Sequence, residues 1–405
     1  MTSDPQELYV WVWLPGHTSP VVAGLLEAIG ETYQFTYGIS YLDRPDAVAL
    51  YLPELPLEKG RRRPPSGMRV AGCISDAAPD SWGRRVIETR LGGPGQEVGF
   101  LTYLLESGSD RIGALDFQAS SSQYVNRWPA ATLEDMVAAA ERIDAGEPLP
   151  PALDAALLHG SSIGGARPKI ALDDGNHQYI GKLSSHSDIY PVVKAEGVAM
   201  ELARRVGLHV APTRMDRVIG RDLLLVERFD RTAQGGRRMV VSAHTILGAD
   251  SVGGSLASYY ALAETIRFRF TEPDAALREL FSRIVFNICV SNTDDHSRNH
   301  AAFWDGKTLT LTPAYDITPQ ARTAGTATQA MEIGRNGFNS ARLDGCVEVA
   351  VDYHLDKADA AEIVEHQVET IRAEWADVAD TCRLTESERK GFWERLVLNP
   401  DIFES

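Results

Sequence analysis

The spacing of apolar residues predicts both strands and helices in the first part of the chain. Residues 8–14 form a short run rich in valine and tryptophan, as is typical of a strand. The segment after Asp80 predicts a short helix that ends at glycines, and residues 113–117 predict a second strand. Residues 132–145 predict a clear helix, with Thr132 as its N-cap. This part of the chain is therefore expected to be of mixed α/β structure.

Two more predicted strands follow a glycine-rich stretch. The stretch reads SSIGGARPK over residues 161–169, and after it come a strand, an Asp-Gly turn and a strand that ends near Lys182. A helix is expected around residues 194–206, where Gly207 ends it. The run LLLVERFDR, residues 223–231, predicts an apolar strand that leads into charged residues.

Helices dominate the chain from about Ala261 onward. Within residues 271–290 the apolar positions share one helical stripe, with Thr271 expected to cap the helix and Pro273 in its first turn. Residues 356–399 are also predicted to be helical, with a capping box that starts at Thr385. The stripe consists of Leu277, Leu280, Phe281, Ile284, Val285, Ile288 and Cys289.

The order of these elements predicts an α+β protein with a two-lobed, protein-kinase-like fold, in which a mixed α/β lobe precedes an all-helical lobe. We expect three parts in the 405-residue chain. Residues 1–125 form an N-terminal α/β subdomain, and residues 126–255 form an N-lobe with the glycine loop, a phosphate-binding lysine and a hinge. Residues 256–405 form a helical C-lobe with the catalytic loop and metal ligands. Element order alone does not establish function.

Charge and composition narrow the classes of partner. The net charge of −16 disfavours tight binding of nucleic acid by this chain alone and suggests a basic partner protein. The first residues carry an acidic residue where a signal peptide needs basic ones, and no run approaches the roughly 20 apolar residues of a membrane span. We therefore expect a cytoplasmic protein that does not bind membranes. The four cysteines are far apart, which indicates neither a disulfide framework nor a thiolate zinc site.

The most informative stretch is SNTDDHSRNHAAFWDGKTLTLTPAYD, residues 291–316. Asp294 and Asn299 form a D-x-x-x-x-N pair, a hairpin around Asp305-Gly306 follows, and Asp316 comes after the hairpin. Transfer of a phosphoryl group from ATP needs one carboxylate at the acceptor hydroxyl, and an asparagine and a second carboxylate on Mg²⁺. We predict that Asp294 is the base or orienting group and that Asn299 and Asp316 bind Mg²⁺.

Other parts of a nucleotide site occur in the expected order. Lys182 lies on a strand after the glycine loop and could neutralise phosphate charge, with Glu196 as its partner. Gly164 and Gly165 would let backbone N–H groups approach phosphates, although the loop lacks both GxGxxG and the Walker pattern. The adenine ring would lie at the 223–231 run, against residues such as Phe229. An exposed strand lysine, a simple turn and a strand end with ion pairs are the alternative interpretations.

With these motifs in order, the chain resembles the HipA family of bacterial serine/threonine kinase toxins. The stretches SSIGGARPK, YIGKL, VERFDR, NTDDHSRN and LTPAYD carry the resemblance, and N-terminal segments such as DAAPDSWGRRVI agree with it. The resemblance implies that Asp294 is catalytic, that Asn299 and Asp316 bind the metal and that Lys182 binds phosphate. It places Glu227 and Phe229 at the hinge, and His296 and Tyr315 in the nucleotide site.

The family resemblance also implies a biological setting. Ser162 matches a serine that family members autophosphorylate, which silences the kinase because a phosphate there could not share the loop with ATP. Family members phosphorylate translation components such as aminoacyl-tRNA synthetases. A small helix-turn-helix antitoxin, HipB-like, restrains them, so contact with DNA would be indirect. Asp295 departs from the family, which commonly has glycine there, and it could alter the pKa of Asp294, contact the metal or clash with the acceptor.

Three alternatives stay open at this point. Asp294, His296 and His300 could form a His/Asp metal site. The chain could be a lipid or small-molecule kinase, since D-x-H-x-x-N also resembles phosphoinositide kinases. It could also be a catalytically weak or dead nucleotide-binding module in an antitoxin–DNA complex.

Overall fold

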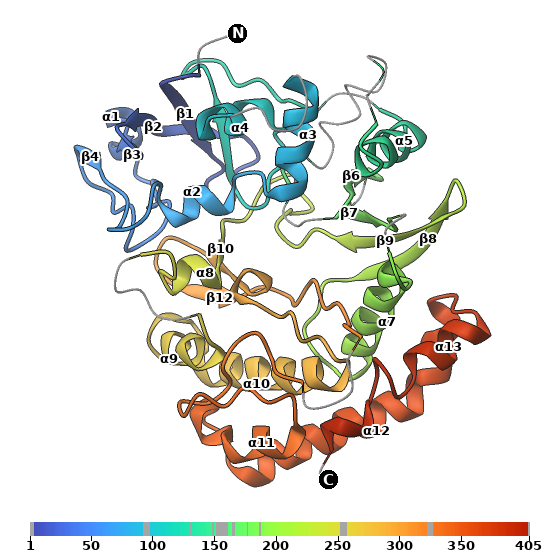
Figure 1. Cartoon of the computed structure of the whole chain (residues 1–405). Coiled ribbons are helices and arrows are strands. Elements are labelled where there is room, and N and C mark those ends of the chain that lie inside the picture. Colours follow the sequence, from blue (N-terminus) through green and yellow to red (C-terminus); the bar gives the residue numbers. More distant parts are fainter. Residues whose placement is uncertain are drawn as a thin grey trace.

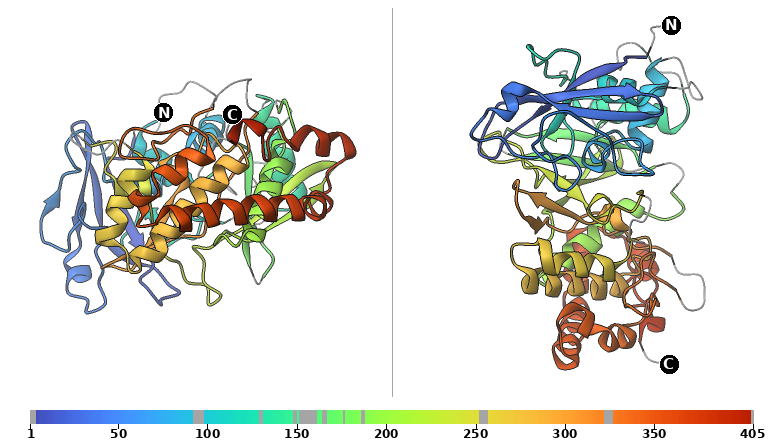
Figure 2. Two further views of the ribbon diagram at one scale, coloured as in Figure 1. Left: turned by 90° about the horizontal axis from the view of Figure 1, so that it is seen from below. Right: turned by 90° about the vertical axis from the view of Figure 1, so that its left-hand side faces the viewer.

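The computed structural model describes residues 4–91, 98–128, 131–147, 150, 161–163, 167–175, 177–185, 188–251, 257–321 and 327–403. Figure 1 shows a β-rich part that contains the N-terminus and a helical part that contains the C-terminus. In the side view of Figure 2, the N-terminal sheet lies at one end of the molecule and the C-terminal helices at the other. The two-lobed α+β architecture predicted from the sequence is therefore present, whereas the exact subdomain limits stay a prediction.

The N-terminal part is built on an antiparallel five-stranded sheet in the order β4-β3-β2-β1-β5. In β1, Leu8, Val10 and Val12 are fully buried, because alternate residues of a strand face the same side of the sheet. The strands are β1 (Glu7–Val12), β2 (Val21–Ile29), β3 (Thr32–Tyr37), β4 (Arg61–Arg62) and β5 (Leu115–Gln118). The helices are α1 (Ile39–Leu42), α2 (Gly72–Asp76), α3 (Ser81–Leu91) and α4 (Phe100–Glu106).

A second antiparallel sheet, in the order β6-β7-β9-β8, carries the predicted phosphate lysine. Helix α7 packs closely against it, because a Cβ on Gly197 would lie 2.6 Å from the sulfur of Met215. Helix α5 begins at a cap formed by Thr132, as predicted. The elements are α5 (Leu133–Asp144), β6 (Lys169–Asp173), β7 (Gln178–Leu183), α7 (Val192–Arg205), β8 (Thr213–Val218) and β9 (Arg221–Glu227).

The C-terminal part is helical apart from a small sheet in the order β10-β11-β12. Strands β11 and β12 form the hairpin predicted around Asp305-Gly306. The strands are β10 (Val240–Ser242), β11 (Ala301–Trp304) and β12 (Leu309–Leu311). The helices are α8 (Ala243–Ile246), α9 (Tyr259–Arg269), α10 (Pro273–Cys289), α11 (Leu343–Glu348), α12 (Lys357–Thr381) and α13 (Glu386–Phe392), with short 3-10 turns at Ser297–Asn299, Ala350–Tyr353 and Pro400–Ile402.

Helix α10 holds the C-terminal part together. The predicted apolar stripe is buried along its whole length. The predicted cap is wrong, because Glu272 is the N-cap residue and makes no side-chain cap bond. Thr271 instead donates its backbone N–H to Leu309 O at 3.0 Å. This bond to β12 holds Thr271 in a position from which its hydroxyl does not cap the helix. The capping box at Thr385 is present at the start of α13.

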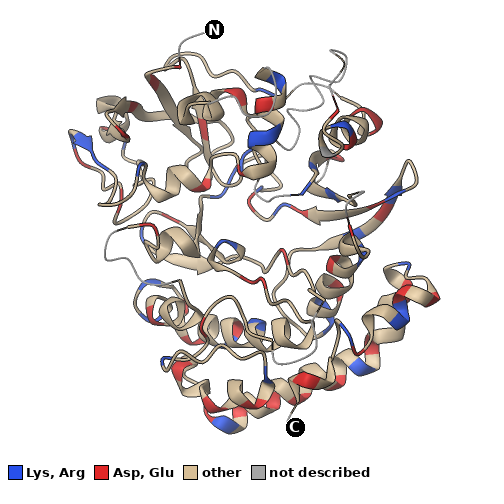
Figure 3. Cartoon of the chain, viewed as in Figure 1, with Lys and Arg blue, Asp and Glu red and all other residues tan. Residues whose placement is uncertain are grey.

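The surface charge is unevenly distributed. Acidic side chains recur along α12 at the base of the molecule (Figure 3), where seven acidic residues accompany two basic ones. None of the helices in the described part of the chain combines the length and apolar character that a membrane span requires.

Candidate active site

Lys182 is the centre of a partly buried cluster that joins three separate elements. Its Nζ donates to Glu196 Oε1 at 2.6 Å and to Asp316 Oδ1 at 2.5 Å. Lys182 comes from β7, Glu196 from α7 and Asp316 from the segment after β12. The helix brings Glu196 to the sheet because the adjoining Gly197 packs against Met215 of β8 and Leu224 of β9. The structure therefore brings together the lysine, its predicted partner and one predicted metal ligand.

The charges in this cluster stabilise one another. Burial favours the neutral form of Lys182, but the charges of Asp316 and Glu196 outweigh it and raise the lysine pKa above its usual value. The charge of Lys182 lowers the pKa of Asp316, and that of His296 adds to the effect. Lys182 is therefore a cation and Asp316 an anion at neutral pH.

Asp316 adopts a backbone conformation that is unusual for a residue with a side chain. Its φ is 59°, in the left-handed region. Such conformations cost about 1 kcal/mol or more for a residue other than glycine and tend to occur at functional sites. The neighbouring Tyr315 hydroxyl donates to Arg298 O at 2.8 Å, which ties this segment to the residue before Asn299. The two predicted metal ligands therefore lie on segments that contact each other.

The loop after α10 carries the predicted catalytic residue. Asp294 is exposed, and Asn299 is half-buried at the end of a 3-10 turn that starts with Ser297. The Asn299 N–H donates to His296 O at 2.8 Å, which fixes the backbone of the turn at this residue. Carboxylate and amide oxygens are the hard donors that Mg²⁺ prefers, so Asn299 and Asp316 are chemically suited to hold it.

Asp295 faces the opposite way from Asp294. It is buried, and its Oδ2 accepts hydrogen bonds from Asn287 Nδ2 at 2.8 Å, from His300 Nε2 at 2.6 Å and from the Tyr259 hydroxyl. The expected effects of Asp295 on the metal or the acceptor are therefore wrong, because this carboxylate anchors the loop to α9 and α10. His300 is turned inward with it, and the described residues contain no cluster of histidine and acidic side chains suited to a metal ion. The alternative His/Asp metal site is not formed.

The predicted hinge lies where β9 ends. The Phe229 ring is 5.6 Å from the Tyr315 ring and 5.8 Å from the Phe303 ring, which creates an aromatic surface beside the cluster. The Glu227 carboxylate accepts a hydrogen bond from His177 Nδ1 at 2.9 Å. The backbone N–H of Glu227 donates to Pro212 O at 2.9 Å. Three distant parts of the chain thus supply Phe229, Tyr315 and Lys182. Tyr315 directly precedes Asp316, which is a partner of Lys182.

Comparison with known families identifies the chain. The family model of the HipA-like C-terminal domain matches residues 161–375, and the model of the HipA N-terminal domain matches residues 12–118. The chain belongs to the HipA family. The resemblance inferred from the motifs is therefore confirmed.

Individual HipA relatives are distant. The chain is 25% identical to the serine/threonine-protein kinase toxin HipA of Shewanella oneidensis over 38% of its own length, and this match spans only 42% of that protein. It is 25% identical to the putative kinase Y4mE of Sinorhizobium fredii over 70% of this chain and 71% of that protein. The structure of Shewanella oneidensis HipA, solved with HipB and operator DNA, matches with a TM-score of 0.69 at 18% identity, over 95% of this chain and 93% of that one. This likeness shows a shared fold.

The HipA N-terminal domain contacts both ends of the candidate site, which the motifs did not reveal. At the hinge, buried Arg228 pairs with Asp110 at 2.6 Å and with Asp230 at 2.7 Å, and Gly113 N donates to Asp230 Oδ2 at 2.7 Å. The alternative interpretation of VERFDR as a strand end with ion pairs is thus also correct. Asp110 lies more than a hundred residues from Arg228, so only the long-range fold could pair them.

At the other end, the same domain contacts the start of the glycine loop. A Cβ on Gly83 of α3 would lie 2.0 Å from Ser161 O, and Gly108 N donates to Ser161 Oγ at 3.1 Å. Ser162 is 2% exposed, and its Oγ has no hydrogen-bond partner in the described part of the chain. Gly164 and Gly165 lie outside the described residues, so their predicted role stays a prediction.

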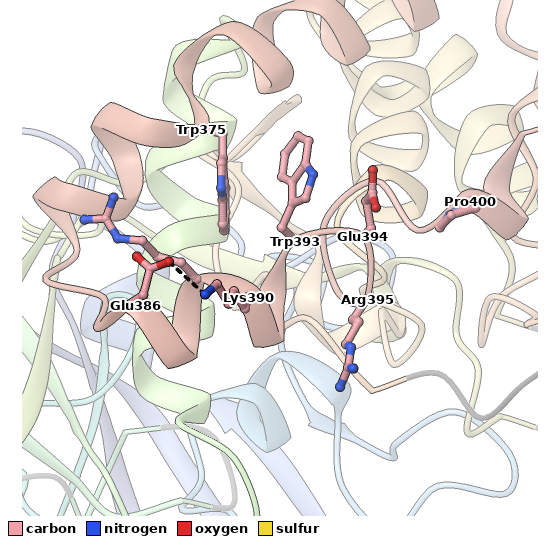
Figure 4. Close-up of a pocket in the computed structure, with 8 residues that line it drawn as sticks. Trp375, Glu386, Lys390, Trp393, Glu394, Arg395 and Pro400 are labelled. Carbon is pink, nitrogen blue, oxygen red and sulfur yellow. Dashed lines mark ion pairs between the residues drawn. The ribbon is translucent and has the colours of Figure 1, made fainter.

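A separate surface pocket lies between α12 and α13. Figure 4 shows the rings of Trp375 and Trp393 standing side by side in it, with centroids 5.1 Å apart, and the Glu386–Lys390 ion pair beside them. None of the residues that line this pocket belongs to the cluster around Lys182. The pocket therefore does not enter the assignment of the site.

Proposed function

We propose that this chain is an ATP- and Mg²⁺-dependent serine/threonine protein kinase that acts as a HipA-like toxin. The observation that carries the proposal is the contact of Lys182 with both Glu196 and Asp316. A lysine on a strand, a glutamate on the following helix and an aspartate after the catalytic loop are the arrangement that positions a nucleoside triphosphate in kinases. Membership of the HipA family supports the same conclusion.

Each residue has a distinct task in this proposal. Lys182 holds phosphate oxygens, and Glu196 keeps the ammonium group in place. Phe229 and Tyr315 pack against the adenine, and the backbone around Glu227 and nearby His296 complete the nucleotide site. Asp294 orients the acceptor hydroxyl and accepts its proton, for which its exposure on the loop is suitable.

The metal would be held by the oxygen atoms of Asn299 and Asp316. When bound, Mg²⁺ neutralises the charge of the β- and γ-phosphates and orients them for in-line transfer. Asp316 would have to exchange its bond with Lys182 for the metal, so Lys182 would then be free to turn to the phosphates. The contact between Lys182 and Asp316 thus holds both side chains close to where the phosphates and the metal would bind.

We propose that Ser162 is an autophosphorylation site that silences the kinase. The side chain is almost fully buried, and a phosphate carries close to two negative charges at neutral pH. Burying such a group without partners is strongly unfavourable, so a phosphorylated Ser162 would have to leave its position. The segment next to it, and with it the nucleotide site, would be displaced.

We propose a protein of the translation machinery, such as an aminoacyl-tRNA synthetase, as the substrate, and a small basic HipB-like antitoxin as the partner. The partner proposal is supported by the net charge of −16, by the acidic surface of α12 and by the fold shared with a HipA solved with HipB and operator DNA. Contact with DNA would occur through the antitoxin, and the kinase would work in the cytoplasm, where translation takes place.

The test is phosphate transfer from labelled ATP to the protein itself and to a cell extract. Asp294→Ala should reduce the rate roughly 10²- to 10⁴-fold if Asp294 acts as the base. An unchanged rate would remove Asp294 from the mechanism. Transfer to lipids but not to proteins would favour the lipid-kinase alternative, and ATP binding without any transfer would favour the inactive module. The inward orientation of Asp295 argues against that last alternative in one respect, because this carboxylate does not lie beside Asp294 where it could disturb catalysis.

A further inference from the structure

The turn Ser297–Asn299, which carries a proposed metal ligand, is held from two sides. On one side, the Tyr315 hydroxyl donates to Arg298 O at 2.8 Å. On the other side, His244 Nδ1 lies 3.1 Å from Ser297 Oγ, which is hydrogen-bond distance. His244 belongs to the short helix α8, which packs against the turn. The histidine thus contacts the catalytic loop from an element that lies outside the sequence motifs.

His244 also contacts a carboxylate. Its Nε2 lies 2.8 Å from Asp250 Oδ2, so the imidazole stands between an aspartate and a serine. The same Asp250 oxygen lies 3.6 Å from the Arg298 guanidinium, in the middle of the turn. Hydrolytic enzymes use serine, histidine and aspartate in this order, but Ser297 is only 5% exposed and is thus shielded from a substrate. These residues are therefore suited to hold the turn in place and not to attack a substrate.

Helix α8 is in turn attached to the HipA N-terminal domain. Asp76, the last residue of α2, accepts hydrogen bonds from the Ser242 backbone N–H at 2.8 Å and from the Ser242 hydroxyl at 2.7 Å. Ser242 is the N-cap residue of α8, and its hydroxyl also accepts from Thr245 N at 3.2 Å. The two helices approach so closely that a Cβ on Gly72 would lie 2.6 Å from the Thr245 side chain. The N-terminal domain therefore fixes α8, and α8 contacts the turn.

We propose that His244 is a positioning residue for phosphate transfer, which fixes the turn Ser297–Asn299, and that Asp76 makes the N-terminal domain a required part of this arrangement. The inference rests on the proposed kinase function, because it concerns the catalytic loop of that site. The bonds to Asp295 anchor this loop on its inner side, and His244 provides a second anchor next to the metal ligand. Transfer needs both anchors, because a small misplacement of reacting groups costs much of the rate.

The first test needs no nucleotide. Amide hydrogen exchange of the free protein reports how firmly the turn is held. His244→Ala should speed exchange within residues 297–299 by roughly 3- to 10-fold, the change that corresponds to one lost hydrogen bond between neutral groups, and should leave exchange in β7 and α7 unchanged. His17→Ala is the matched control, because His17 likewise faces a carboxylate, that of Asp46 at 3.1 Å, within the N-terminal domain. It should leave exchange in the turn at the wild-type rate.

The second test is phosphate transfer at saturating Mg²⁺ and varied ATP. His244→Ala should lower kcat roughly 3- to 10-fold and keep the KM for ATP within about twofold. His244→Asn, whose amide can take the place of Nδ1, should restore most of the rate. Ser297→Ala should cost as much as His244→Ala, and the double variant should cost no more than either, because all three remove the same contact.

Asp76→Asn tests the contribution of the N-terminal domain. It should lower kcat roughly 10-fold, because the bonds from Ser242 to a charged acceptor are stronger than those between neutral groups. Glu54→Gln is the matched control, because Glu54 accepts from Gly72 N and Cys73 N of the same helix at 3.0 Å but stays within the N-terminal domain. It should lower the unfolding temperature as Asp76→Asn does and keep kcat.

The outcomes separate the inference from the proposed function. If the wild-type protein transfers no phosphate, the proposed function fails, whereas unchanged exchange in His244→Ala refutes the anchor whether or not transfer occurs. If transfer occurs and His244→Ala changes only the unfolding temperature, or raises the KM for ATP with an unchanged kcat, the positioning role is wrong. Equal kcat values for Asp76→Asn and Glu54→Gln would exclude the N-terminal domain from the arrangement.

Discussion

Replacing Glu196 by glutamine tests the bond on which the site depends. The substitution keeps the shape of the side chain and an oxygen that can accept a hydrogen bond, but it removes the negative charge. Lys182 would then have only Asp316 as a charged partner. The lysine would be drawn toward the proposed metal ligand, and Asp316 would be less available for Mg²⁺.

The cost of Glu196→Gln follows from the geometry of its contact with Lys182. A hydrogen bond of 2.6 Å between two charged groups, with Glu196 only 3% exposed, contributes about 1.5–3 kcal/mol. Breaking a buried ion pair outright costs about 3–5 kcal/mol, but Asp316 still compensates the charge of Lys182. We therefore expect a loss of about 1–2 kcal/mol in the free energy of unfolding, since one of two partners remains. The rate of phosphate transfer should fall by roughly 10- to 100-fold, as each tenfold corresponds to about 1.4 kcal/mol.

The assay combines urea unfolding with single-turnover phosphate transfer at saturating ATP. Glu201→Gln is the matched control, because Glu201 lies on the same helix and binds Arg204 and Arg205 at 2.6 and 2.8 Å, away from Lys182. That variant should lose a similar amount of stability and keep its transfer rate. If Glu196→Gln and Glu201→Gln have the same transfer rate, the assignment of Glu196 is refuted.

Three further predictions concern the parts that support the site. Asp116 is buried, and although burial opposes its ionisation, two arginines lower its pKa to about 2. Its contribution of about 2 kcal/mol to stability is thus present above pH 4 and lost between about pH 4 and pH 2. Urea unfolding from pH 6 to pH 3 should show roughly half of this loss, and Asp116→Asn should be less stable at pH 6 with a flatter profile. Asp295→Asn removes the charge that three donors share, so transfer should fall roughly 10-fold or more with an unchanged KM for ATP, and a normal rate would contradict the anchoring role. Gly83→Ala places a methyl group against Ser161 O. Thermal unfolding should show a loss of about 1–3 kcal/mol in stability, and ATP titration should show weaker binding. Wild-type behaviour in both measurements would exclude that contact as a support of the loop.

The sequence predicts the local parts of the site well, because each depends on short spacing. The β6–β7 pair, the helix that carries Glu196 and the hairpin before Asp316 all follow from patterns within a few tens of residues. The placement of Lys182 and Glu196 side by side could be anticipated because a strand and the next helix pack together. Family membership then links them with Asp316, which is 134 residues from Lys182.

Other features depend on long-range packing and could not be predicted. Strand β2 does not alternate strictly between buried and exposed residues, so its pattern lacks the strand signal. The contacts of Asp80 with Lys169 and of Asp110 with Arg228 join segments that are distant in the sequence, and ordinary loop acids look the same. The sequence alone suggests that Asp295 could act on the metal or the acceptor because it follows Asp294. Successive residues of a loop can face opposite sides, however, and the three donors to Asp295 come from α9, α10 and His300.

A crystal structure of the protein with Mg²⁺ and a non-hydrolysable ATP analogue tests the central claim most directly. The account predicts oxygen atoms of Asn299 and Asp316 about 2.1 Å from a metal ion that also contacts the phosphates, with Lys182 on the phosphates and Asp294 facing the γ-phosphate. A nucleotide bound elsewhere, or a cleft in which Asp316 still holds Lys182 and no metal contacts Asn299, would contradict it.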